Sequence, residues 1–267
     1  MIHLRSIKYQ PKEPMPNQYP FNLKIIKDFV ELSFTSPVTF FVGENGSGKS
    51  TLLEGIALAT NAITIGSVNG DQDQSLDSTR SLSRYLKTVW NRNTHRGFFL
   101  RAEDFFGYTR KLAQTKEAIQ KEIDSVQDRY TKRSSFAVEL AKLPHKRDLY
   151  ELEQRYGNKL EAASHGESFL NFFQTRFVPN GLYLLDEPEA ALSPISQLAF
   201  ITMTKQMVEN NAQFIIATHS PILMAFPNAV IFDFDRTPIQ TTLYDQVKHV
   251  EIMKGFLDNP QSFLKYL

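Results

Sequence analysis

The sequence predicts an α/β fold in which a mainly parallel sheet is flanked by helices, and three observations support this prediction. Apolar segments of strand length, at 182–185, 214–217 and 230–234, alternate with helical segments such as 195–208. An apolar strand at 38–42 leads into a glycine-rich loop and then into a stretch whose apolar residues recur at helical spacing. Two adjacent carboxylates directly follow the strand at 182–185. Such alternation is typical of parallel sheets whose strand ends carry the functional loops.

The segments around this framework have different characters. Residues 3–41 are rich in β-forming side chains and repeatedly broken by proline, so we expect short strands and an antiparallel β portion near the N-terminus. The polar stretch 69–83 predicts a loop, which could equally be a lid. Between 110 and 160, short heptad-like runs predict an extended helical subdomain interrupted at Pro144.

Length and composition predict one main domain. A chain of 267 residues with 42% hydrophobic content can bury one sizeable core, so we expect a single domain over 1–267. Within it, we expect a β portion and glycine-loop core at 1–100, a helical subdomain at about 101–175 and the second half of the core at 176–267.

Charge and residue usage exclude several classes of protein. The formal net charge of +1 gives no whole-protein electrostatic argument for nucleic acid, and the absence of cysteine excludes disulfides and thiolate metal sites. The longest apolar runs, 38–42 and 214–217, are far shorter than the roughly 20 residues of a membrane helix. We therefore expect a cytoplasmic protein without a transmembrane segment or signal peptide.

The glycine-rich loop carries the strongest motif in the chain. Its spacing is that of a phosphate-binding loop, in which backbone N–H groups and a helix N-terminus surround phosphate oxygens. Lys49 would bring a positive charge to the terminal phosphates, and Ser50 would bring a hydroxyl ligand to Mg²⁺. The predicted nucleotide-binding residues of this loop are Gly43, Glu44, Asn45, Gly46, Ser47, Gly48, Lys49, Ser50 and Thr51.

The carboxylates Asp186 and Glu187 form the second motif. They end an apolar strand, which would place them at the carboxyl edge of the sheet where the glycine-rich loop also opens. Asp186 suits Mg²⁺, and Glu187 suits a water molecule that it would orient and deprotonate as general base. The plainer alternative is a solvated pair of acids before a proline turn.

The third motif is Ser164-His165-Gly166-Glu167-Ser168. It precedes an apolar helical run, so Ser164 and Glu167 fit a helix capping box. Its position just before the paired carboxylates also suits a functional role, and the residues alone leave both interpretations open.

In their order, these motifs make the chain resemble the nucleotide-binding domain of the ABC ATPase superfamily, in particular its stand-alone, non-transporter bacterial predicted ATPases. The resemblance covers nearly the whole chain and implies a P-loop NTPase fold of ABC type that binds ATP and Mg²⁺ and hydrolyses ATP to ADP and phosphate. It also implies a head-to-tail homodimer with ATP sandwiched between the subunits. The tail from Tyr244 through His249 to Phe263 and Leu264 is similar to the same branch.

The resemblance gives the third motif and His219 their expected roles. Ser164, Gly166 and Glu167 match the serine, second glycine and glutamine of the family signature Leu-Ser-Gly-Gly-Gln, which contacts ATP held by the partner; Ala163 and His165 depart from it. In Ala217-Thr218-His219-Ser220, His219 matches the family histidine that contacts the γ-phosphate. The loop Ala190 to Ser193 matches one that crosses to the partner's site, with serine in place of the usual aspartate.

Two expected elements are unresolved in the sequence. The family glutamine after the strand that follows the phosphate-loop helix is absent from 97–103, and either Glu103, near Mg²⁺ and water, or Arg101, as a phosphate contact, could replace it. A salt-bridged strand end would explain both residues equally well. The adenine-stacking aromatic could be any of Tyr9, Tyr19 and Phe21, although core packing would also explain them.

The cluster of basic residues between 80 and 101 does not by itself identify a binding partner. Basic residues with Tyr85 and Trp90 among them suit nucleic acid, yet a polar helix face with a buried tryptophan has the same composition. The resemblance favours a DNA-associated or defence-related ATPase whose helical subdomain meets nucleic acid or an effector protein. A peripheral ABC transporter subunit and a non-hydrolysing ATP-dependent switch are the alternatives. The basic residues are Arg80, Arg84, Lys87, Arg92, Arg96 and Arg101.

Overall fold

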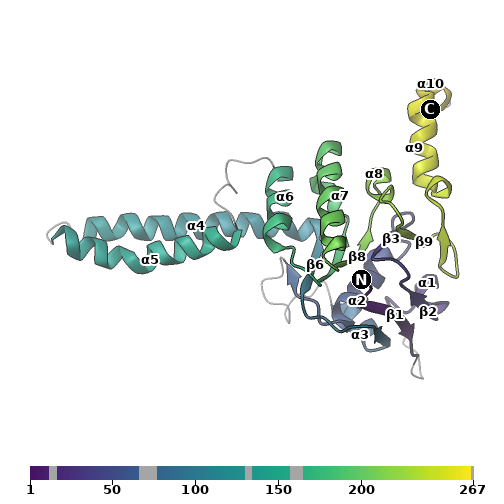
Figure 1. Cartoon of the computed structure of the whole chain (residues 1–267), viewed down its shortest axis with the longest axis horizontal. Coiled ribbons are helices and arrows are strands. Elements are labelled where there is room, and N and C mark those ends of the chain that lie inside the picture. The colour runs from purple at the N-terminus through teal and green to yellow at the C-terminus, as the bar shows by residue number, and fades with distance from the viewer. Residues whose placement is uncertain (12–16, 66–76, 130–133, 157–164, 266–267) are drawn as a thin grey trace.

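A computed structural model describes residues 1–11, 17–65, 77–129, 134–156 and 165–265 of the chain. Figure 1 shows how its helices and strands are arranged. The elements are β1 (Leu4–Tyr9), α1 (Lys24–Lys27), β2 (Glu31–Ser33), β3 (Val38–Val42), α2 (Lys49–Ala59), β4 (Thr64–Ile65), α3 (Asp77–Ser83), β5 (Leu86–Trp90), β6 (Gly97–Arg101), α4 (Ala102–Arg129), α5 (Ser135–Tyr156), α6 (His165–Arg176), β7 (Leu182–Asp186), the 3₁₀ helix η2 (Pro188–Ala191), α7 (Pro194–Glu209), β8 (Gln213–Ala217), α8 (Pro221–Met224), β9 (Val230–Asp233), β10 (Gln240–Thr242), the 3₁₀ helix η3 (Tyr244–Gln246), α9 (Lys248–Asp258) and α10 (Pro260–Leu264).

The central sheet has seven strands in the order β10-β9-β3-β8-β7-β6-β4. All neighbouring pairs are parallel except β10 and β9, which confirms the mainly parallel sheet that the sequence predicts. Every residue of β3, β7 and β8 is buried. This burial explains why the three strands are apolar at most positions rather than at every second one, because both faces of a central parallel strand are covered.

A second sheet of three antiparallel strands, in the order β2-β1-β5, confirms the antiparallel portion near the N-terminus. Its edge strand β5 comes from later in the chain and contains Trp90, which is half-buried. For the basic segment that contains Trp90, the alternative of a polar helix face with a buried tryptophan was therefore wrong. Leu86 and Trp90 lie on a strand because β5 pairs along the whole length of β1.

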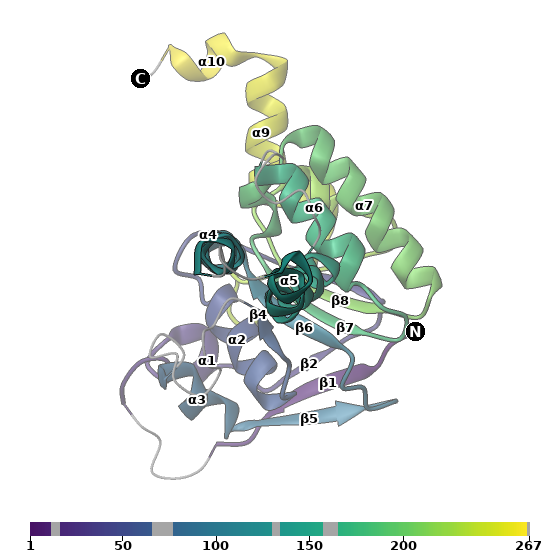
Figure 2. The same cartoon turned by 90° about the vertical axis from the view of Figure 1, so that its left-hand side faces the viewer.

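Two apolar clusters cover the two faces of the central sheet. One contains Leu52, Leu53 and Ile56 of α2, which lie between this sheet and the antiparallel sheet (Figure 2). The other contains buried phenylalanines of α6 and α7, including Phe173 and Phe200. The helices α2, α6 and α7 are thereby fixed relative to the central strands, which positions the loops at one edge of the sheet.

The helical subdomain is a hairpin of α4 and α5 that extends far from the sheet (Figure 1). We expected the helical subdomain at about 101–175 and its heptad-like runs from 110, and α4 begins at Ala102, directly after β6. Pro144 does not interrupt the subdomain, because α5 continues through it while packing along α4. Such packing offsets the backbone hydrogen bond that a proline removes from a helix.

The polar stretch 69–83 divides into two parts. Residues 77–83 form the helix α3, so the loop prediction was wrong there. Leu82 of α3 is buried in the cluster that contains α2, which explains the helix. The remainder of the predicted loop or lid lies outside the described residues. Over the ranges that the structure describes, no helix combines the length and the apolar character needed to cross a bilayer.

Candidate functional site

The glycine-rich loop connects β3 to α2 and has the backbone of a phosphate cradle. Gly43, Gly46 and Gly48 have φ angles of 145°, 80° and 96°, which glycine adopts without the strain of a side chain. A Cβ atom at Gly48 would lie 2.7 Å from Cγ2 of Ile25, so only glycine fits. No side chain caps the N-terminus of α2. Its first N–H groups are thus left to an anion, and the loop fits a phosphate.

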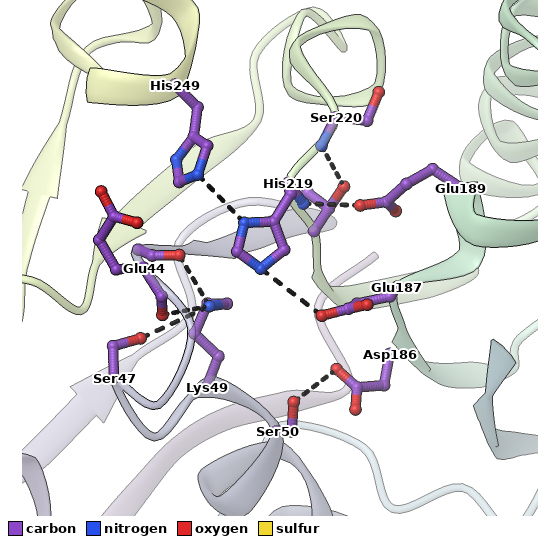
Figure 3. A network of polar contacts seen from close by, with 12 residues as sticks. Glu44, Ser47, Lys49, Ser50, Asp186, Glu187, Glu189, His219, Ser220 and His249 are labelled. Atoms are coloured by element: carbon purple, nitrogen blue, oxygen red, sulfur yellow. Dashed lines mark hydrogen bonds and ion pairs between the residues drawn. The ribbon is translucent and has the colours of Figure 1, made fainter. Parts of the chain in front are cut away.

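Lys49 lies under this loop with 4% of its surface exposed. Its Nζ donates to the carbonyl oxygens of Gly43 and Glu44 at 2.7 and 2.9 Å (Figure 3). Burial lowers the pKa of Lys49, and Glu187 is the foremost of the carboxylates that oppose this effect. The ammonium group therefore lies beside the loop that would surround the phosphates.

Ser50 and Asp186 meet at the end of β7. The Ser50 hydroxyl donates to Oδ1 of Asp186 at 3.0 Å (Figure 3). Burial raises the pKa of Asp186 to about 7, against the hydrogen bond from Ser50, which lowers it. A buried carboxylate beside a hydroxyl suits Mg²⁺, since a divalent cation would favour the ionised carboxylate.

Within the described ranges, there is no group of three or more histidine and carboxylate side chains arranged to hold a metal. Mg²⁺ typically takes only one or two protein ligands and completes its shell with phosphate oxygens and water. Ser50 and Asp186 fit that pattern.

Glu187 and His219 face each other from the ends of two neighbouring strands, β7 and β8. Oε1 of Glu187 lies 3.5 Å from Nε2 of His219 (Figure 3). Glu187 has a left-handed backbone, with φ of 48°, and its N–H donates to the Ala217 carbonyl at 2.9 Å. Burial and then the charge of Lys49 lower the pKa of His219. The arrangement places a half-exposed carboxylate beside a histidine whose pKa is lowered.

Other residues reach this site without having been predicted. Glu189 accepts a hydrogen bond from the His219 backbone N–H at 2.6 Å, and Asp235 accepts one from the Glu44 N–H at 2.8 Å. His249 and Lys248 approach from α9. Asp235 could have been predicted from the sequence. Like Asp186, it comes just after an apolar segment of strand length, and the carboxyl ends of parallel strands share one edge of the sheet.

The third motif lies at the N-terminus of α6. Ser164 lies outside the described residues, whereas Gly166 and Glu167 lie in the first turn. Gly166 packs against the loop after Glu187, since a Cβ there would lie 3.1 Å from the Ala191 carbonyl oxygen. The Glu167 residue is exposed. In the same loop, Ser193 caps α7 by accepting from the Ser196 N–H at 3.2 Å.

Arg101 and Glu103 lie at the end of β6. Arg101 is 6% exposed and donates to Asp104 at 2.6 Å and to Glu54 at 3.2 Å. The Glu103 side chain is 78% exposed and lies 3.8 Å from Arg101. The salt-bridged strand end is thus present, and Arg101 is buried among carboxylates, whereas Arg84 and Lys87 are exposed. Ligation of a metal by Glu103 stays a prediction.

The aromatic candidates for adenine differ in their surroundings. Phe21 is 1% exposed and packs edge-on against Tyr85, and Tyr9 packs against Tyr85 as well. Tyr19 is 48% exposed and its hydroxyl lies 2.8 Å from Oγ1 of Thr51. Only Tyr19 of the three is both exposed and in contact with α2.

A cavity of about 330 Å³ opens along the glycine-rich loop. The start of α1, with Leu23 before it, and the segment after β9 form its other walls. Its lining residues are Leu23, Lys24, Ile25, Glu44, Asn45, Gly46, Ser47, Phe234, Asp235 and Thr237.

The sequence matches one family model and resembles several solved structures. Residues 21–130 match the model of a family described as an AAA domain. The Smc head domain with an extended coiled coil from Pyrococcus furiosus is 12% identical, with a TM-score of 0.45 over 96% of this chain and 100% of that one. The ADP conformation of MJ1267, an ATP-binding cassette of an ABC transporter, is 16% identical, with a TM-score of 0.45 over 100% of this chain and 98% of that one. The SMC head domain from Thermotoga maritima is 14% identical, with a TM-score of 0.39 over 87% and 94% of the two chains. No curated protein matches the sequence significantly.

Proposed function

We propose that this chain is an ABC-type ATPase nucleotide-binding domain that binds ATP with Mg²⁺ in the cytoplasm and hydrolyses it to ADP and phosphate. The observation that carries the proposal is the meeting of three strand ends at one place. The loop after β3 holds Lys49, the end of β7 holds Asp186 and Glu187, and the end of β8 holds His219. Each group has a separate task in phosphoryl transfer.

The described side chains divide these tasks between binding and proton transfer. The loop N–H groups and Lys49 would bind the phosphates and offset the negative charge that develops on them. Glu187 would orient the attacking water and accept its proton, since its carboxylate is half-exposed and faces the site. His219 would donate from Nε2 toward the terminal phosphate. Asp186 and the Ser50 hydroxyl would hold Mg²⁺, which neutralises phosphate charge when bound.

We also propose that two copies associate head to tail, each completing the other's site with Ser164, Gly166 and Glu167. The position of Gly166 and Glu167 in the first turn of α6 supports this, because Glu167 is exposed there and the N–H groups of a helix N-terminus can meet a phosphate held by another subunit. ATP would then join the subunits, and its hydrolysis would release them.

A Glu187→Gln variant tests hydrolysis and dimerisation together. We expect it to bind ATP, to lose about 10²–10⁴-fold in kcat because the proton acceptor is gone, and to accumulate as a dimer with ATP and Mg²⁺. Phosphate release and light scattering after size-exclusion chromatography measure the two effects. Glu209→Gln, at the exposed end of α7, is the matched control. A Glu187→Gln protein that stays monomeric at saturating ATP and Mg²⁺ would contradict the dimer.

For the biological setting, we propose a DNA-associated or defence-related complex in which the α4–α5 hairpin contacts nucleic acid or an effector protein. The hairpin projects from the sheet and offers a long surface for such a contact (Figure 1). ATP-dependent DNA binding that weakens with salt would support nucleic acid, and its absence at low salt would count against it. Co-purification with a membrane protein would instead favour a transporter subunit. ATP binding without phosphate release would favour a non-hydrolysing switch.

A further inference from the structure

The helix α9 begins at the nucleotide site, where its first two residues each contact a residue of that site. Nζ of Lys248 lies 2.8 Å from Oε1 of Glu44, in the glycine-rich loop. Nε2 of His249 lies 3.2 Å from Nδ1 of His219, and the two rings meet edge to face with their centroids 4.9 Å apart (Figure 3). From this start, α9 and α10 project away from the sheet (Figure 2).

The start of α9 is held firmly. Val247 and Val250 are both 3% exposed and belong to the apolar cluster that contains α6 and α7. The backbone of His219 is fixed as well, because its N–H donates to Glu189 at 2.6 Å. The contact between the two imidazoles therefore joins two anchored segments rather than two free side chains.

A hydrogen bond between two neutral imidazoles needs one donor and one acceptor. If Nδ1 of His219 donated, its Nε2 would present a lone pair to the Glu187 carboxylate 3.5 Å away, and two acceptors would face each other. If His249 donates instead, Nε2 of His219 carries the hydrogen and points at that carboxylate. This nitrogen is buried and makes no hydrogen bond within the described structure, so it is free to donate to an incoming anion.

We propose that His249 is a positioning residue, which donates from Nε2 to Nδ1 of His219 and thereby holds His219 in the tautomer with hydrogen on Nε2. A histidine whose one nitrogen acts on a substrate is commonly oriented through the other nitrogen. The catalytic consequence rests on the proposed ATP hydrolysis, whereas the tautomer does not. The start of α9 is then part of the nucleotide site, so a displacement of α9 would change the state of His219.

Substitutions at position 249 test the consequence for catalysis. His249→Leu removes the donor, and we expect kcat for ATP hydrolysis to fall about 10–100-fold while KM changes less than about threefold, since the phosphate loop is untouched. His249→Gln keeps a donor near the former Nε2, and we expect it to recover most of that loss. Lys254 is exposed on the same helix, so Lys254→Leu shows the effect of placing a leucine on α9 away from His219. Thermal unfolding identifies any variant that fails to fold.

Nitrogen-15 NMR of the histidine rings tests the tautomer in the nucleotide-free protein, whether or not the protein hydrolyses ATP. We expect Nε2 of His219 to resonate as a protonated nitrogen and Nδ1 as an unprotonated one in the wild type, and the two tautomers to mix in His249→Leu. Hydrogen on Nδ1 of His219 in the wild type would overturn the proposal. So would an unchanged kcat in His249→Leu when the wild type is active. A wild type without phosphate release but with the expected spectrum would refute only the proposed hydrolysis.

Discussion

The central sheet and the α4–α5 hairpin differ in how their apolar side chains are covered. Strands β3, β7 and β8 are buried along their whole length, between apolar clusters on both faces. On α5, by contrast, Phe136, Leu140 and Leu143 are 77%, 56% and 55% exposed. These three residues follow one another at intervals of four and three, so they lie along one side of the helix.

This difference in burial suits two different tasks, catalysis at the sheet and contact with another molecule at the hairpin. The proposed phosphoryl transfer needs several groups held in fixed mutual positions, and a sheet packed on both faces holds the ends of its strands in that way. The hairpin packs mainly against itself and leaves apolar side chains in water, which is typical of a surface that meets another molecule. Changes in the core should therefore alter catalysis and stability, whereas changes on the hairpin should alter neither greatly.

The largest effect should follow from Lys49→Ala. Removing the ammonium group leaves the phosphate loop without its charged side chain, and we expect kcat/KM for ATP hydrolysis to fall about 10³-fold or more. Steady-state phosphate release measures this. Lys146→Ala, in an exposed ion pair with Glu139 on the hairpin, should change kcat/KM less than about twofold. Equal losses in the two variants would refute the separation of the two regions.

Stability should show the second largest difference. Phe173 is 0% exposed beneath the sheet, and Phe173→Ala should cost about 3–5 kcal/mol because it opens a cavity in a close-packed cluster. Leu140→Ala on the hairpin should change the free energy of unfolding by less than about 0.5 kcal/mol. Urea unfolding followed by circular dichroism measures both. A large loss for Leu140→Ala would mean that its side of α5 is covered in the isolated protein.

The sequence predicted most of the sheet and most of the site for one physical reason. In a parallel sheet, the carboxyl ends of strands share an edge, so Asp186, Glu187 and His219 could be placed near Lys49 from the strands that precede them. Their distances agree with that expectation, with Glu187 and His219 at 3.5 Å and Ser50 and Asp186 at 3.0 Å. Their roles in catalysis stay predictions.

The parts that the sequence did not predict depend on packing between distant segments. His249 meets His219 because Val247 and Val250 enter a cluster built by strands and helices from elsewhere in the chain, and no local pattern encodes that meeting. The helix α3 forms in a polar stretch because Leu82 packs against α2. A salt-bridged strand end was one of the expectations for Arg101, but its partner Glu54, far away in the chain, could not be identified from the sequence.

The smallest effect that still distinguishes the two regions is the pH dependence of the stabilisation that Asp186→Asn gives to the folded protein. The pKa of Asp186 is raised by burial to about 7 from an ordinary value of 3.8, so the folded state binds this proton more tightly than the unfolded state does. The cost of ionising Asp186 in the fold therefore grows as pH rises from about 4 to about 7 and is constant above that range. Asparagine is neutral throughout and can still accept from Ser50, so we expect Asp186→Asn to stabilise the nucleotide-free protein by about 1–2 kcal/mol more at pH 8 than at pH 5.

Thermal unfolding at the two pH values measures this effect, which should appear as a Tm gain larger by a few degrees at pH 8. Asp148→Asn, which removes an exposed carboxylate from the hairpin, controls for the loss of one negative charge. ATP with Mg²⁺ should stabilise the wild type more than Asp186→Asn, since a cation beside the carboxylate favours its ionised form. A gain that is equal at both pH values would show that burial of charge at Asp186 is not its cause. The core would then hold Asp186 in a solvated setting, as the hairpin holds Asp148, and the contrast between the two regions would not extend to their charges.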